Sequence, residues 1–259
     1  MPSRPVALVT GAAKRLGRAI ALELGAHGWD VAVHHRRSPV EAAGVVAALE
    51  AAGARAASFA ADLGDEAACA ALVPAVVARL ERLDAVVNNA SAFEHDDVAT
   101  FSYAAMERHW RANTAPAIVL ARALHAHLAG CTETGCVVNL LDQKLWNPNP
   151  DHLSYTLSKA ALQAATVVLA QALAPQVRVC GVAPGVTLPS GPMSEAEFAV
   201  AHRRTPLGHS STAADVAGAV RYLLSAPAVT GCTLLVDGGQ HLTPQPRDVY
   251  YLGAREKAT

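Results

Sequence analysis

The stretch 137–161 reads VVNLLDQKLWNPNPDHLSYTLSKAA and contains a strand pattern, a loop and a helix pattern in succession. It begins with the apolar run VVNLL, which is typical of a buried strand. Asparagines and prolines between Trp146 and Pro150 then interrupt the regular pattern. A helix is expected next, and it carries Tyr155 and Lys159. The stretch therefore indicates one strand–loop–helix unit of an α/β protein.

Tyr155 and Lys159 lie four residues apart, so a helix places them on one face. A cation held near a phenol favours the ionised form and lowers its pKa from about 10, which makes the tyrosine a usable acid or base. Asp142 follows the strand and can face the same cleft. Two solvated neighbours on a helix are the alternative, so the pair needs support from the rest of the chain.

The composition provides a large apolar core, because 52% of the 259 residues are hydrophobic. A net charge of −1 argues against a general nucleic-acid surface. No apolar run approaches the roughly 20 residues of a membrane span, and an apolar strand so close to Met1 leaves no room for a signal peptide. We therefore expect a soluble, cytoplasmic protein without nucleic-acid or membrane partners.

The cysteine and histidine patterns do not predict a metal site. The five cysteines are scattered and never spaced Cys-x-x-Cys, which is typical of thiols in a reducing compartment. His125 and His127 lie two apart on an expected helix, whereas His34 and His35 are neighbours on an expected strand. Neither pair converges on one point.

Short apolar runs alternate with helical patterns along the chain. This alternation predicts a mostly parallel sheet covered by helices on both faces. Without repeats or linkers, residues 1–259 are expected to form one domain. Strands are expected at 5–9, 30–35, 55–60, 85–87, 137–141, 177–182 and 233–236, and helices near 15–27, 40–52, 65–82, 103–128 (interrupted near Pro116) and 213–225, besides the helix that carries Tyr155.

Polar or glycine-containing motifs follow the expected strands at their carboxyl ends, where doubly wound sheets bind ligands. The first turn, residues 10–17 (TGAAKRLG), would present N–H groups and a helix N-terminus to a pyrophosphate, although it would equally serve to pack the helix. Arg36, Arg37 and Ser38 end the second strand, where an NAD site needs an acid. Guanidinium groups grip a 2′-phosphate, so NADP(H) is predicted, with solvated arginines as the alternative.

One set of residues occurs in an order and at spacings that are specific enough to indicate a family: Thr10, Gly11, Gly17, Asn88, Asn89, Ala90, Asn113, Tyr155, Lys159, Pro184 and Gly185. Together they resemble the short-chain dehydrogenase/reductases over nearly the whole chain. The resemblance implies a Rossmann fold with a seven-stranded, mostly parallel sheet of order 3-2-1-4-5-6-7, and a homotetramer. It also implies that Tyr155 exchanges a proton with substrate and Lys159 lowers its pKa and holds the nicotinamide ribose. Asn113 would support a water chain behind the lysine.

The resemblance and the strand ends together define an expected cofactor site. Residues 186–210 would form a substrate-covering loop that includes Pro189, Gly191 and Pro192. The tail, 241–259, with Arg247, Tyr250 and Tyr251, could approach the site of a neighbouring subunit. The expected NADP(H)-binding residues are Gly11, Lys14, Arg15, Leu16, Gly17, His34, Arg36, Arg37, Ser38, Asp62, Leu63, Asn89, Ala90, Ser91, Tyr155, Lys159, Pro184, Gly185 and Val186.

Two positions depart from the common pattern of that family. Arg15 stands where a glycine is usual, and Asp142 stands where a serine usually contacts a substrate carbonyl. An ionised carboxylate would repel a developing alkoxide, whereas a carboxyl group suits N–H donors or a C=N bond that needs a proton on nitrogen. Crowding would raise the Asp142 pKa and let it serve as an acid.

Both departures resemble the pteridine reductase branch, as do His34, Arg37 and the sequence NNASAF at 88–93. The resemblance implies that Phe93 stacks a pterin on the nicotinamide, while Arg15, Ser91, Asp142 and Tyr155 address its heteroatoms. An ordinary loop-anchoring aromatic is the alternative for Phe93.

The predicted reaction is hydride transfer from NADPH to a C=N bond of a dihydropterin, or of dihydrofolate. The proton would come from Tyr155, assisted by Asp142 and Lys159 and resupplied through Asn113. Two alternatives remain: a carbonyl reductase acting on ketones or 3-oxoacyl thioesters, and a non-catalytic NADP(H) sensor. The sensor is disfavoured because both Tyr155 and Lys159 are present.

Overall fold

The computed structural model describes residues 4–190, 193–249 and 251. Its sheet has the order β3-β2-β1-β4-β5-β6-β7, and each neighbouring pair is parallel. The predicted strand order and doubly wound class are confirmed. The strands are β1 Val6–Val9, β2 Asp30–His35, β3 Ala56–Ala60, β4 Ala85–Asn88, β5 Gly135–Leu140, β6 Val177–Pro184 and β7 Thr233–Val236.

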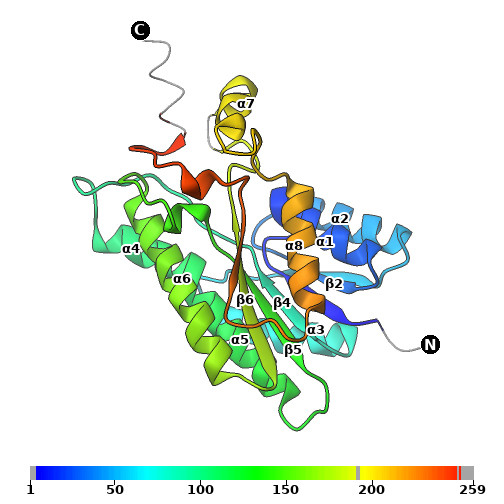
Figure 1. Ribbon diagram of the computed structural model, residues 1–259. Coiled ribbons are helices and arrows are strands. Elements are labelled where there is room, and N and C mark those ends of the chain that lie inside the picture. Colours follow the sequence, from blue (N-terminus) through cyan, green and yellow to red (C-terminus); the bar gives the residue numbers. More distant parts are fainter. Residues whose placement is uncertain (1–3, 191–192, 250, 252–259) are drawn as a thin grey trace.

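Helices cover both faces of this sheet (Figure 1). Helices α1, α2 and α8 pack together on one face, and α3, α5 and α6 on the other. Within the described ranges, no helix is long and apolar enough to cross a membrane. The helices are α1 Arg15–Ala26, α2 Pro39–Ala51, α3 Glu66–Leu80, α4 Tyr103–His109, α5 Ala115–Leu128, α6 Leu153–Ala172, α7 Glu195–Arg203 and α8 Ala213–Ser225.

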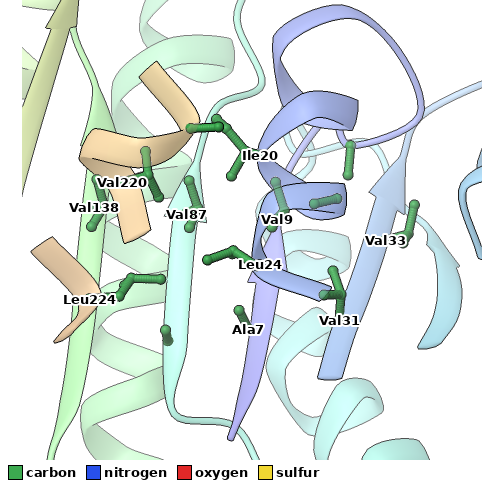
Figure 2. Packing of buried hydrophobic residues seen from close by; sticks show 14 of the residues in the cluster. Ala7, Val9, Ile20, Leu24, Val31, Val33, Val87, Val138, Val220 and Leu224 are labelled. Carbon is green, nitrogen blue, oxygen red and sulfur yellow. The ribbon is translucent and has the colours of Figure 1, made fainter. Parts of the chain in front are cut away.

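The apolar runs of the central strands supply two cores at once, because successive side chains point to opposite faces. In β1, Ala7 and Val9 belong to the core under α1 and α8, whereas Val6 and Leu8 belong to the core on the other face. Continuous apolar sequence is therefore required here, rather than alternation. Figure 2 shows how side chains of α1 and α8 meet the first of these cores, with Ile20, Leu24, Val220 and Leu224 directed towards Val9, Val87 and Val138.

Three local elements differ from the sequence-based expectations. The helical region before β5 is interrupted by a π-helix at Trp110–Thr114, ahead of Pro116. The substrate-covering segment, expected to be a loop, contains α7, which starts with a capping box between Ser194 and Glu197. Short 3-10 turns, η2 at Gln143–Leu145 and η3 at Gln240–Leu242, follow β5 and β7.

The first turn requires glycine at Gly17. A Cβ there would collide with the carbonyl oxygen of Gly11 and the side-chain amide of Asn89. We expect Gly17→Ala to destabilise the protein by about 2 kcal/mol, since backbone must move. Gly44→Ala is the control: Gly44 is exposed within α2 and nothing lies near its Cβ position, so about 1 kcal/mol of stabilisation is expected. Urea unfolding of both variants tests this, and equal effects would contradict it.

Candidate active site

A cavity of about 840 Å³ lies at the carboxyl ends of β4, β5 and β6. Figure 1 shows this end of the sheet facing α7 and the C-terminal segment. The volume lies in the range of small-molecule sites, roughly 300–1,000 Å³. It brings together these residues of the predicted site: Arg15, Leu16, Asn89, Ser91, Phe93, Asp142, Tyr155, Lys159, Pro184, Gly185 and Val186.

The turn after β1 is held by hydrogen bonds to residues of β2 and to the end of β4. The backbone N–H of Gly11, whose φ is +62°, donates to His34 Nδ1 at 3.1 Å. His34 Nε2 lies 3.1 Å from the carbonyl oxygen of Ala61, so this nitrogen carries the proton. Burial lowers the pKa of His34 to about 4, which keeps it neutral. His34 therefore shapes the turn through protein contacts on both of its ring nitrogens.

Asn89 and Thr10 tie this turn to the end of β4. The side-chain amide of Asn89 donates to the carbonyl oxygen of Thr10 at 2.9 Å. In return, the Thr10 hydroxyl accepts from the backbone N–H groups of Asn89 and Ala90, at 2.9 and 3.0 Å. The loop between β1 and α1 is thus pre-organised by side chains of two adjacent strands.

Arg15 starts α1 with a left-handed backbone, φ +51°. This conformation favours glycine, which explains the usual glycine at this position, and it costs an arginine roughly 1–2 kcal/mol. The guanidinium reaches across the cavity, where Nη2 donates to the carbonyl oxygen of Pro189 at 2.7 Å. Arg15 therefore connects the β1 turn to the segment that follows β6.

Asp142, Tyr155 and Lys159 converge at the end of β5. The Tyr155 hydroxyl donates to Asp142 Oδ2 at 2.8 Å, and Asp142 Oδ1 accepts from the backbone N–H of Lys144 at 2.8 Å. Lys159 Nζ donates to the carbonyl oxygen of Leu140 at 2.6 Å and lies 5.8 Å from the centre of the Tyr155 ring. The i, i+4 spacing on α6 and the strand end do bring these groups together.

Burial controls the protonation of this trio. It raises the pKa of Asp142 above its usual range, as the sequence suggested, and lowers the pKa of Lys159 from 10.5 to about 8. The expectation for Tyr155 was wrong in this arrangement: its pKa lies well above 10, because burial and the Asp142 carboxylate both disfavour a phenolate. Tyr155 is consequently held as a neutral phenol, the form that donates a proton.

Asn113 sits within the π-helix, which directs its amide into the protein. Its Oδ1 accepts from the backbone N–H of Ala92 at 2.7 Å and from the Ser91 hydroxyl at 3.2 Å. Its Nδ2 donates to the Ala92 carbonyl oxygen and to the Ser158 hydroxyl, at 3.0 and 2.9 Å. Asn113 therefore positions the loop that carries Phe93; its role in a water chain stays a prediction.

Phe93 borders the cavity with 45% of its surface exposed. Its edge meets Tyr155 at a centroid distance of 4.7 Å, and one face stacks on His152 at 4.2 Å. His152 precedes α6 with a φ of +55°, and burial lowers its pKa, so its ring is neutral at pH 7. Sequence reasoning missed His152; its position three residues before Tyr155 was the available signal.

The predicted residues after β2 and β3 lie outside the cavity. Arg36 and Arg37 are exposed at the end of β2, while Lys14 forms an ion pair with Glu41 at 2.7 Å. Asp62 accepts from the backbone N–H of Gly64 at 3.0 Å, beside the buried Leu63. These groups lie at the ends of β2 and β3 and, for Lys14, just before α1. None of them lines the cavity that contains Asp142.

The C-terminal segment contacts this chain's own cavity. Its approach to the site of a neighbouring subunit stays a prediction. Arg247 Nη2 lies 2.6 Å from Asp151 Oδ1, and the backbone N–H of Asp248 donates to the same carboxylate at 2.7 Å. Asp248 Oδ2 lies 3.4 Å from the buried Lys144 ammonium. No pattern in the sequence predicted these contacts. Gly191, Pro192, Tyr250 and Leu252 lie outside the described residues.

Comparisons with known proteins agree with this geometry. A family model described as enoyl-(acyl carrier protein) reductase matches residues 11–241. Pteridine reductase 1 of Leishmania tarentolae is 32% identical, over 93% of this chain and 98% of that protein. The granaticin polyketide synthase putative ketoacyl reductase 2 of Streptomyces violaceoruber is 36% identical over 93% and 98%. The crystal structure of FolM alternative dihydrofolate reductase 1 from Brucella canis, complexed with NADP, is 37% identical over 96% and 98%, with a TM-score of 0.90.

The lowered pKa of Lys159 predicts a pH-dependent stability. Between pH 8 and 10.5 the unfolded chain holds this proton more tightly than the folded protein, so folding stability rises with pH in that window. Relative to Lys159→Met, wild type should gain about 2 kcal/mol between pH 8 and about pH 10. Urea unfolding across this range measures the difference. Lys14→Met, at the surface, should track wild type; parallel curves for all three proteins would contradict the prediction.

Arg37 provides a test of the predicted 2′-phosphate contact. Loss of one charge-assisted hydrogen bond costs roughly 1.5–3 kcal/mol, so Arg37→Ala should raise the Kd for NADPH about ten- to hundred-fold. The Kd for NADH should stay within about two-fold, because NADH lacks that phosphate. Arg79→Ala, on exposed α3 surface, serves as control. Equal weakening of both nucleotides would show that Arg37 does not read the phosphate.

Proposed function

The chain belongs to the short-chain dehydrogenase/reductase family, and we propose that it is an NADPH-dependent reductase of the C=N bond of dihydropterins. The observation that carries this proposal is the hydrogen bond from Tyr155 to the buried Asp142 beside Lys159. The identity to a pteridine reductase and to an NADP-bound dihydrofolate reductase supports the same reading.

Asp142 sets the polarity of the reacting position. Two buried unit charges 4 Å apart interact by about 4 kcal/mol at an effective dielectric of 20, so an ionised Asp142 would strongly oppose a developing alkoxide. A nitrogen that gains a proton develops no such negative charge. The pKa of Asp142 is raised by burial. The carboxyl group can therefore accept a hydrogen bond from a substrate N–H in its ionised form and donate one to a ring nitrogen in its protonated form. A C=N substrate fits this electrostatic setting better than a ketone does.

The residues of the turn and the strand ends fit a bound NADPH. The Gly11 turn and the start of α1 would hold the pyrophosphate, and Arg37 with Ser38 the 2′-phosphate. Gly185 is required by the packing of the chain itself, because a Cβ there would run into Ser210 and Gln240. Lys159 would hold the nicotinamide ribose. NADPH supplies the hydride when bound, and the protein orients and protonates.

The proton path uses groups that already touch. Tyr155, held as a phenol, delivers its proton to the substrate nitrogen, and Asp142 shares the proton through their 2.8 Å hydrogen bond. As the phenol loses its proton, the Lys159 ammonium stabilises the phenolate. Asn113 keeps the loop of Phe93 in place through its contacts to Ser91 and Ala92.

The cavity walls suit a flat, nitrogen-rich ring. The exposed part of the Phe93 ring offers a stacking surface, and such ring pairs contribute about 1 kcal/mol beyond burial. Gln143 borders the cavity, and its Oε1 is buried without a hydrogen-bond partner among the described residues. An acceptor in that state is costly, so an N–H group of a ligand would stabilise it. Arg15 also lines the cavity and supplies a cation.

A ketoacyl or ketone reductase is the second candidate. It is favoured by the 36% identity to the putative ketoacyl reductase of Streptomyces violaceoruber. The position of Asp142 separates the two candidates, since ketone reduction in this family uses a serine there.

Exchange of that carboxyl group tests the proposed function. We expect Asp142→Ser to lower kcat for dihydrobiopterin about 100-fold, the scale of a general acid, while any ketone turnover stays equal or rises. The assay is NADPH oxidation at ~340 nm with dihydrobiopterin, dihydrofolate and a ketone panel.

Asp65→Ser is the matched control, because serine is also a good N-cap for α3 and Asp65 does not line the cavity. Its kinetics should equal those of wild type. Wild-type turnover of ketones without turnover of pterins would overturn the proposed function in favour of the second candidate. No NADPH oxidation with any of these substrates would favour a non-catalytic NADP(H) sensor.

A further inference from the structure

A series of ring contacts runs along the cavity from the reacting tyrosine to the C-terminal segment. After Tyr155, Phe93 and His152, the series continues from His152 to His95 at a centroid distance of 5.1 Å. His95 in turn contacts Tyr251 at 5.6 Å. All five side chains line the cavity. The cavity therefore continues beyond the ring that would stack on Phe93, and its continuation is walled by aromatic and imidazole rings.

The C-terminal end of this series is anchored by charge. Arg247 is bound by the buried Asp151 carboxylate through both Nε, at 2.8 Å, and Nη2. The Arg247 guanidinium also lies 4.7 Å from the centre of the Tyr251 ring, within cation–π range. Lys144, 4% exposed, holds the next residue, Asp248. Residue 251 is thus tied to the rest of the cavity wall through two buried charged groups.

The chemistry of this outer wall differs from that of the inner one. Near Asp142 the cavity presents a carboxyl, a phenol and an ammonium, which address ring heteroatoms. Around His95 and Tyr251 it presents ring faces and edges, and the buried His152 beside them is uncharged at pH 7. Rings of this kind bind another planar aromatic group by offset stacking or edge contacts, and an aliphatic chain gains less from them.

We propose that His95, His152 and Tyr251 form a second subsite that binds an aryl substituent of the pterin substrate. The inference rests on the proposed function and narrows it: the preferred substrates are pterins whose side chain carries an aromatic ring, such as dihydrofolate, over those with an aliphatic chain, such as dihydrobiopterin. Tyr251 is then a specificity-determining residue supplied by the C-terminal segment of the same chain.

Steady-state kinetics of Tyr251→Ala with both substrates test this subsite. An aromatic contact of ordinary strength corresponds to a change of about ten-fold. We expect kcat/KM for dihydrofolate to fall about ten-fold, with the loss in KM, while kcat/KM for dihydrobiopterin stays within about two-fold. Tyr251→Phe keeps the ring and should retain the wild-type ratio. Tyr222→Ala, an exposed tyrosine on α8, is the control for loss of a surface ring.

Each outcome bears on a separate statement. Selective loss with dihydrofolate, restored in Tyr251→Phe, supports the aryl subsite. Wild-type turnover of pterins with an unchanged or equally reduced ratio in Tyr251→Ala overturns the subsite and leaves the proposed function standing. No turnover of either pterin by the wild-type enzyme overturns the proposed function, and the subsite with it.

Discussion

Parallel pairing of strands is the constraint on which the rest of this structure depends. A parallel neighbour can be reached only by crossing a face of the sheet, so every connection is a helix or a long loop, and every carboxyl end lies at one edge. Residues far apart in sequence thereby meet: Arg15 after β1, Ser91 after β4 and Asp142 after β5 all border one cavity. The double core explains why the central strands are mostly apolar.

At this edge of the sheet, burial shifts the pKa values of Asp142, Tyr155 and Lys159 more than any single pairwise contact does. The cation expected to acidify Tyr155 lies 5.8 Å from its ring, while the Asp142 carboxyl lies 2.8 Å from its hydroxyl. Desolvation and the nearer anion together outweigh the cation, so the phenol keeps its proton. The same burial lowers the pKa of Lys159 and raises that of Asp142. Burial thus shifts the pKa of each of the three groups in the direction that favours its neutral form.

The sequence predicted those features that follow from local pattern. The alternation of strand and helix patterns predicted the fold class, because such patterns depend only on local sequence. The positions where strands end predicted Asp142 and the β1 turn as parts of the site. The sequence did not predict the π-helix at Trp110–Thr114, helix α7 within the segment expected to be a loop, or the contacts of Arg247 and Asp248 with Asp151. These depend on contacts between distant segments, such as Asn113 with Ala92 or Arg247 with Asp151, which no periodicity encodes.

The C-terminal segment also acts on the reacting groups through charge. The Asp248 carboxylate raises the pKa of Asp142 and of Tyr155, after burial, and it is paired with Lys144, whose backbone N–H binds Asp142. Lys144 therefore links the segment to the carboxyl group of Asp142. The C-terminal segment thus both lines the cavity and contributes to the raised pKa of Asp142. Both effects arise within one chain, because Arg247 and Asp248 bind the Asp151 carboxylate of the same chain.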